Sequence, residues 1–150
     1  MNTYPSAPHY IVDTSVVLKW FVQNDESDWQ QARELRTAYL EKRCTLSCPE
    51  YLVLELANTL KAGRRFNAAE IKAISESFRA LDITLEPLRW PTLLKAVDLA
   101  SALDVAVYDS YFLASAIESN GTLVTADNHF VRKVGKHSNL VALRQLPTPK

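Results

Sequence analysis

The sequence predicts an α/β protein in which a mostly parallel sheet is covered by helices on both faces. Short apolar stretches of strand length alternate with longer segments of helical periodicity, and parallel strands need such crossover connections. Two of the apolar stretches end on an aspartate, Asp13 and Asp127. The 150 residues, 47% of them hydrophobic, are enough for one domain with a core of its own.

The first elements form a strand-to-helix unit after a short polar lead. We expect a strand at Tyr10–Val12 and a helix at Ser15–Val22. Ser27 has a side chain suited to capping a second helix, which extends to about Lys42. The stretch CTLSCP, residues 44–49, then predicts a short buried strand.

The middle of the chain predicts two helices and a strand. Pro49 suits the first turn of a helix that ends at Gly63. Asn67 and Glu70 have the spacing of a capping box that opens the next helix. The stretch DITLEPL, residues 82–88, follows as a strand.

The last third predicts two more helices and two more strands. One helix covers about residues 91–103, and another starts at or near Asp109 and ends at Gly121. The stretch TLVTAD, residues 122–127, is a strand, and Leu140–Arg144 is the last one. We expect a single domain over residues 1–150, with flexible ends at 1–8 and 147–150.

The remaining composition excludes several classes of protein. Cys44 and Cys48 lie far from all three histidines, so we expect buried thiols rather than a zinc site. There is no N-terminal signal pattern and no apolar run long enough for a membrane, which predicts a cytoplasmic protein. The formal net charge of zero weakens, without excluding, an RNA substrate.

Four acidic residues are candidates for a functional site. Asp13 and Asp127 follow apolar strands, so a parallel sheet places them at the same edge, although either could simply cap a helix. Asp109 heads a largely apolar helix, where a buried acid needs a partner. Glu55 lies in an apolar helix, on a narrow polar stripe with Tyr51 that could equally be a solvated face.

Carboxylates that meet in one place need a counter-charge. Two of them about 5 Å apart repel by roughly 3 kcal/mol at an effective dielectric constant of 20. A hard cation with oxygen ligands, Mg²⁺ or Mn²⁺, would keep them ionised, and it suits phosphodiester hydrolysis through an activated water. The hydroxyls of Thr14, Ser15 and Thr125 could hold waters or phosphate, or could serve only in turns and caps.

Several segments resemble the PIN-domain family, and more specifically the VapC-type toxin ribonucleases. These are IVDTSVVLKWF, the Glu55 of LELANTL, and VYDSYFLASAIESNGTLVTAD, and the similarity covers nearly the whole chain. The resemblance implies a three-layer α/β/α PIN-like fold with about four to five strands. It also implies Mg²⁺- or Mn²⁺-dependent endoribonuclease activity, an RNA substrate, a homodimer and a cognate antitoxin partner.

The resemblance also implies the residues of the site. Its catalytic and metal-binding acids match Asp13, Glu55, Asp109 and Asp127, and supporting positions match Ser15 and Thr125. Some members carry another acid where this chain has His129, which puts affinity for a second metal ion in doubt. Candidate RNA contacts are Lys61, Arg64, Arg65, Arg132, Lys133 and Lys136.

The leading hypothesis is therefore the endoribonuclease toxin of a type II toxin–antitoxin pair. Alternatives are a non-toxic PIN nuclease of RNA maturation and a PIN module that binds without cutting. A phospho-acceptor signalling domain also collects aspartates at strand ends, but such domains pair two acids at the first site, and Asp13 has no acidic neighbour.

Overall fold

The fold is built on a single sheet of parallel strands. The computed structural model describes residues 6–23 and 28–150. Within them, five strands lie in the order β3-β2-β1-β4-β5, and every pair of neighbours is parallel. The strands are β1 (His9–Val12), β2 (Thr45–Pro49), β3 (Thr84–Glu86), β4 (Thr122–Thr125) and β5 (Leu140–Ala142).

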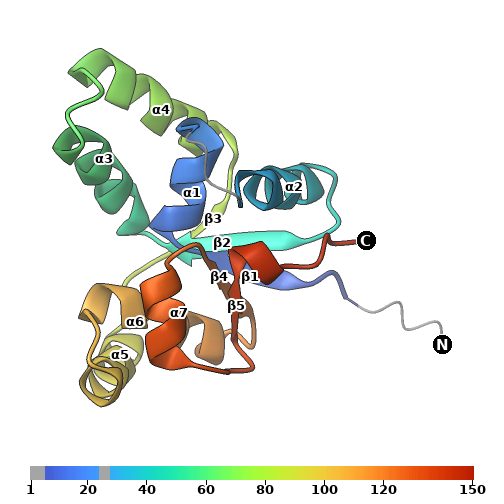
Figure 1. Ribbon diagram of the computed structural model, residues 1–150, viewed down its shortest axis with the longest axis vertical. Helices are drawn as coiled ribbons and strands as arrows, with labels where there is room; N and C mark the ends of the chain where they lie inside the picture. Colours follow the sequence, from blue (N-terminus) through green and yellow to red (C-terminus); the bar gives the residue numbers. More distant parts are fainter. Residues whose placement is uncertain (1–5, 24–27) are drawn as a thin grey trace.

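Helices cover both faces of this sheet, which confirms the predicted three-layer α/β/α fold. In Figure 1, α1 to α4 lie above the sheet and α5 to α7 lie below it. The helices are α1 (Thr14–Phe21), α2 (Trp29–Leu40), α3 (Leu52–Ala62), α4 (Ala68–Ala80), α5 (Trp90–Leu103), α6 (Val107–Glu118) and α7 (Asn128–Val134). A short 3₁₀ turn, Leu143–Gln145, follows β5.

The central strands are apolar on both faces because each face is covered. Val12 of β1 and Val124 of β4 are fully buried, and so is Leu113 of α6. On the other side of the sheet, Val16 and Val17 of α1 are also fully buried. This packing fixes α1 and α6 against the ends of β1 and β4, the two strands that carry candidate acids.

Side chains that the sequence predicts as caps do begin helices. Asn67 and Glu70 form both bonds of the capping box of α4, at 2.9 and 2.7 Å. Asp13 accepts a hydrogen bond from the backbone N–H of Val16, and Asp127 accepts one from Phe130. The two aspartates are therefore helix caps, which leaves open whether they also serve a site.

The structure differs from the predicted elements in a few places. Pro49 is the last residue of β2 rather than part of a helical turn; proline has no N–H to offer the ladder, so it is tolerated at such a strand end. The helix that follows starts only at Leu52. Ser27, the expected cap of α2, lies outside the described residues.

Three further observations concern the C-terminal tail, the two cysteine side chains and the length of the helices relative to a membrane. The tail that we expect to fray lies against α2, where Thr148 donates a hydrogen bond to Glu34. Cys44 and Cys48 are buried free thiols, as predicted. Within residues 6–23 and 28–150, each helix is too short or too polar to span a bilayer.

Candidate active site

The topology brings the first and last candidate acids to one edge of the sheet. β1 and β4 are adjacent, and Val12 is in register with Val124. The chain leaves β1 toward β2 on one side and later returns to β4 on the other, so β1 and β4 form the switch point of the sheet. Asp13 and Asp127 follow these strands directly, at the position where α/β sheets bind ligands.

Hydroxyl groups hold the carboxylate of Asp13. Ser15 donates to Asp13 Oδ1 at 2.5 Å, and Thr125 donates to the other oxygen, Oδ2. The backbone N–H of Val16 also reaches Oδ1, at 3.2 Å. Both oxygens therefore have a fixed direction before any ligand arrives.

The same hydroxyls join α1 to the loop after β4. The Ser15 hydroxyl accepts a hydrogen bond from the backbone N–H of Ala126 at 2.9 Å, and the Thr125 hydroxyl accepts one from Asp127 at 3.1 Å. Of the two roles considered for these hydroxyls, contact with waters or phosphate and service in turns and caps, the structure shows hydrogen bonds to the carboxylate of Asp13 and to the backbone after β4. A supporting role of Ser15 and Thr125 in catalysis stays a prediction.

Glu55 lies on the inner side of α3. Its Oε2 accepts a hydrogen bond of 2.6 Å from the hydroxyl of Thr14, the residue after Asp13. The glutamate is half-buried, whereas Leu54 beside it is 73% exposed. This contact settles the choice between a solvated face and an inward-facing acid in favour of the latter.

Asp109 lies in the first turn of α6 and is half-buried. Burial raises the pKa of its carboxyl group, and the negative charges of Asp127 and Glu55 raise it further. Burial also raises the pKa of Asp13 to about 6, against the lowering effect of Ser15, Thr125 and the Val16 N–H; the charge of Asp109 adds to the increase. The four candidate acids therefore act on one another through one shared space.

Tyr51, at the start of α3, is a residue of this space that the sequence did not single out. Burial raises the pKa of its phenol, followed by the charges of Glu55 and Asp109. Its hydroxyl donates a 2.6 Å hydrogen bond to the carbonyl of Tyr108, the residue before Asp109. The one available signal was its place on the polar stripe of Glu55.

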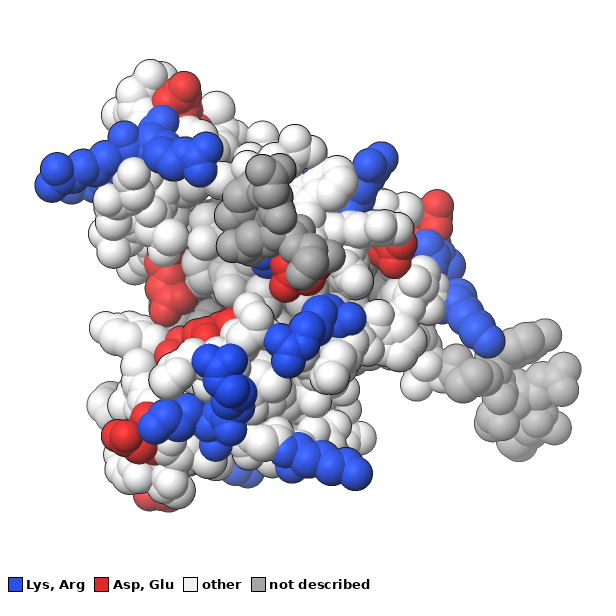
Figure 2. Space-filling view, viewed as in Figure 1, with Lys and Arg blue, Asp and Glu red and all other residues white. Residues whose placement is uncertain are grey.

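The donor set is of the kind that a hard divalent cation requires. The four carboxylates come from the segments that follow β1 and β4, from α3 and from α6, and Figure 2 shows acidic side chains in the hollow between α3–α4 and α5–α6. Among the described residues, no three acidic, histidine or cysteine side chains lie close enough to enclose one ion as they stand.

Other residues singled out in the sequence lie at the rim or outside. His129 is exposed on α7. Asp104, at the end of α5, pairs with Lys133 of α7 at 3.3 Å. Lys61, Arg64 and Arg65 lie at the end of α3 and in the turn toward α4, and Arg132 and Lys136 lie on or after α7; all are exposed.

Comparison with known proteins identifies the fold. A family model of the PIN domain matches residues 10–136 of this sequence. The chain belongs to the PIN domain family. No curated protein sequence matches this PIN domain.

Solved structures with the same fold include proteins of toxin–antitoxin systems. PAE2754 from Pyrobaculum aerophilum superposes with a TM-score of 0.64 at 20% identity, over 92% of this PIN domain and 91% of that chain. VapBC2 from Rickettsia felis, bound to a promoter DNA fragment, gives 0.63 at 17% identity, over 89% and 96%. Mycobacterium tuberculosis VapC20, a toxin that cleaves the sarcin–ricin loop, gives 0.60 at 12% identity, over 78% and 87%.

Proposed function

We propose that this PIN domain is a Mg²⁺- or Mn²⁺-dependent endoribonuclease and the toxin of a type II toxin–antitoxin pair. The observation that carries the proposal is the convergence of the acids: Asp13 and Asp127 follow the adjacent parallel strands β1 and β4, and Thr14, the residue after Asp13, donates a hydrogen bond to Glu55. Carboxylates gathered in this way repel one another at neutral pH, and a bound cation offsets that repulsion. A divalent ion is the simplest such cation.

In this proposal, Asp13, Glu55, Asp109 and Asp127 hold the ion. When bound, the ion supplies an activated water and neutralises charge on the phosphate. Hydrogen bonds from Ser15 and Thr125 fix the direction of both carboxylate oxygens of Asp13, and a hydrogen bond from Thr14 fixes that of Glu55 Oε2. Hydroxyl donors of this kind strengthen a ligand set by reducing the freedom of each carboxylate.

RNA as the substrate, and an antitoxin as the partner, are supported by the family and by surface charge. VapC20 is described as a toxin that cleaves the sarcin–ricin loop, and a protein from Klebsiella pneumoniae with the same fold is described as part of a toxin–antitoxin complex. Basic side chains flank the acidic hollow of this chain, at the α3–α4 turn and on the surface of α7 (Figure 2). Basic side chains at these places can bind the phosphates of an RNA strand that passes over the acids. The proposed location of the reaction is the cytoplasm, where RNA is found.

A homodimer is part of the proposal, and it is supported by an apolar stripe on α5. Trp90, Leu94 and Val97 follow one another at helical spacing and are 76%, 62% and 43% exposed. A contiguous exposed patch of large apolar residues marks an interaction surface. Light scattering should give a dimer mass for the wild type and a monomer mass for Leu94→Glu, with Lys72→Glu on α4 as the matched surface control.

The test of the nuclease assignment is RNA cleavage by matched acid variants. Wild-type protein should cut total RNA with Mg²⁺ or Mn²⁺, and EDTA should stop the reaction. Asp109→Asn should abolish cleavage, while Asp104→Asn should not, because Asp104 lies outside the site and its left-handed backbone tolerates asparagine. Equal activity of Asp109→Asn and wild type would overturn the assignment.

The alternative of a non-toxic nuclease of RNA maturation shares this chemistry and differs in its effect on the cell. Induced expression of the toxin should arrest growth, and co-expression of the cognate antitoxin should restore it. Cleavage in vitro without growth arrest would favour the maturation enzyme.

A further inference from the structure

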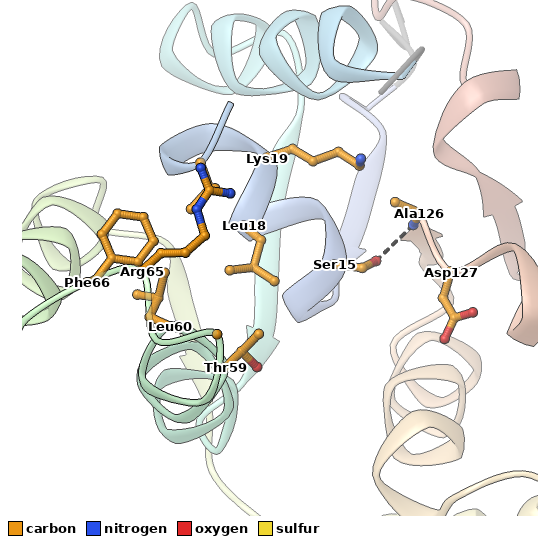
Figure 3. A pocket seen from close by; sticks show the side chains of 11 residues that line it. Ser15, Leu18, Lys19, Thr59, Leu60, Arg65, Phe66, Ala126 and Asp127 are labelled. Carbon is orange, nitrogen blue, oxygen red and sulfur yellow. Dashed lines mark hydrogen bonds between the residues drawn. The ribbon is translucent and has the colours of Figure 1, made fainter. Parts of the chain in front are cut away.

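A pocket lies beside the acidic hollow and shares two residues with it. Its volume is about 420 Å³, within the range of small-molecule sites, about 300–1,000 Å³. Ser15 and Asp127 line one side of it, while Arg65 and Phe66 line the other, from the turn before α4 (Figure 3). A ligand in this pocket would therefore touch Asp127, a proposed metal ligand, and Ser15, which orients Asp13.

Apolar side chains form most of the pocket wall, and the two cationic side chains that line it, Lys19 and Arg65, differ in their ion pairing. Leu18 and Leu60 lie between the two sides, with Phe66 next to them. Lys19 also lines the pocket, but its ammonium group is held by Asp28 at 2.8 Å. Arg65 forms no ion pair with any residue of 6–23 or 28–150, so its guanidinium can bind an anion.

We propose that this pocket binds one nucleotide of the RNA strand, next to the bond that is cut. The base packs against Leu18 and Phe66, and the phosphate of that nucleotide is bound by Arg65. This inference rests on the proposed function, because it takes the scissile phosphate to lie over the acids. It adds a subsite that can select a base, which the acids alone cannot do.

Charge complementarity favours a nucleotide over a purely apolar ligand. A guanidinium presents a planar set of donors that matches phosphate oxygens, and a flat ring can cover the apolar wall. An anion drawn to Arg65 also stays clear of the carboxylate of Asp127, which lies across the pocket. An acidic peptide segment also carries anionic groups that could bind Arg65, and a polyglutamate peptide distinguishes it from RNA in the experiments that follow.

The first experiment measures RNA binding without catalysis. A fluorescent RNA hexamer of random sequence is titrated with metal-free protein in EDTA over a series of salt concentrations. Arg65→Ala should weaken binding and reduce the slope of log K against log salt by about 0.7, the loss of one phosphate contact to a single strand. Arg64→Ala removes the same charge one residue away, outside the pocket, and should reduce the slope by less than Arg65→Ala does. Equal effects of the two variants would show a diffuse basic patch and overturn the proposal.

The second experiment fills the pocket. Thr59 lines it and is exposed, so Thr59→Trp should occupy the space without disturbing the core. Sequencing the ends of a cleaved randomised RNA should show a base preference beside the cut for the wild type, and this preference should be lost in Thr59→Trp and kept in Arg64→Ala. Circular dichroism with a thermal melt checks that each variant is folded.

The two proposals fail in different ways. If wild-type protein cuts RNA but neither Arg65→Ala nor Thr59→Trp differs from Arg64→Ala, the nuclease stands and the nucleotide pocket is wrong. If metal-loaded protein cuts no RNA while Arg65→Ala alone weakens RNA binding in EDTA, the pocket stands and the nuclease is wrong. Binding of a polyglutamate peptide that depends on Arg65, together with RNA binding that does not, identifies a peptide site and overturns the nucleotide assignment.

Discussion

The hydroxyl of Thr14 donates a 2.6 Å hydrogen bond to Glu55, a residue 41 positions later in the chain. Thr14 is the first residue of α1 and Glu55 lies in α3, so this bond connects the helix after β1 to the helix after β2. It also places Glu55 beside the acid that ends β1. The contact explains why a glutamate of an otherwise apolar helix is not turned to solvent.

Removing this hydroxyl should therefore weaken the site without removing an acid. Thr14→Val keeps the shape of the buried side chain but leaves Glu55 without its donor. We expect RNA cleavage to fall by about 10- to 100-fold, the usual effect of losing a partner that orients a metal ligand. The measurement is the initial rate at several Mn²⁺ concentrations, and the loss should be smaller at high metal. Thr14→Ser restores the donor and should retain most of the activity.

The raised pKa of Asp13 predicts how the stability of metal-free protein depends on pH. In the unfolded chain this carboxyl group ionises near pH 4, but in the fold only near pH 6. Between these values the folded state binds more protons than the unfolded state, so the free energy of unfolding decreases as pH rises. The decrease is on the order of 3 kcal/mol and levels off above the folded pKa. Urea unfolding in EDTA across pH 4 to 8 measures it.

Asp13→Asn supplies the control for that pH dependence. Asparagine caps a helix about as well as aspartate and carries no charge, so the cap is kept while the ionisation is removed. The decrease in stability from pH 4 to 6 should become smaller, with Asp109 accounting for what is left. An identical pH profile for variant and wild type would refute the assigned pKa shift.

Gly121 is needed for close packing rather than for an unusual backbone conformation. The left-handed residue that ends α6 is Asn120, whereas a Cβ on Gly121 would lie 2.6 Å from Ile11 Cδ1 and 2.8 Å from His9 Cδ2. Gly121→Ala should destabilise the protein by about 1–3 kcal/mol, as overpacking does. Gly63→Ala, whose Cβ would meet only ordinary contacts, should cost much less in the same urea titration.

The order of strands and helices could be predicted because each face of the sheet is covered, so that strands are continuous apolar runs and helices show their own period. The capping box of Asn67 and Glu70 is a purely local pattern, and it was confirmed. Pro49 was placed wrongly because proline is compatible with both a first helical turn and a strand end. The difference is decided by pairing between β2 and β3, which the sequence does not show.

The site was less predictable wherever a long-range contact decides it. Positions at strand ends predicted that Asp13 and Asp127 lie at the same edge of the sheet, and the adjacent parallel strands β1 and β4 confirm that placement. Glu55 is bound by the Thr14 hydroxyl, and Tyr51 is placed by its contacts with residues of α6. The polar stripe in the sequence includes both residues, but it does not show these contacts.

The proposed divalent cation is bound jointly by Asp13, Glu55, Asp109 and Asp127, and anomalous diffraction from crystals soaked in MnCl₂ can locate it. We expect an anomalous peak between Asp13 and Asp109, within about 2.0–2.5 Å of carboxylate oxygens, that is lost in crystals of Asp109→Asn. A saturated crystal without a peak at these residues, or with manganese bound elsewhere on the protein, would contradict this joint binding.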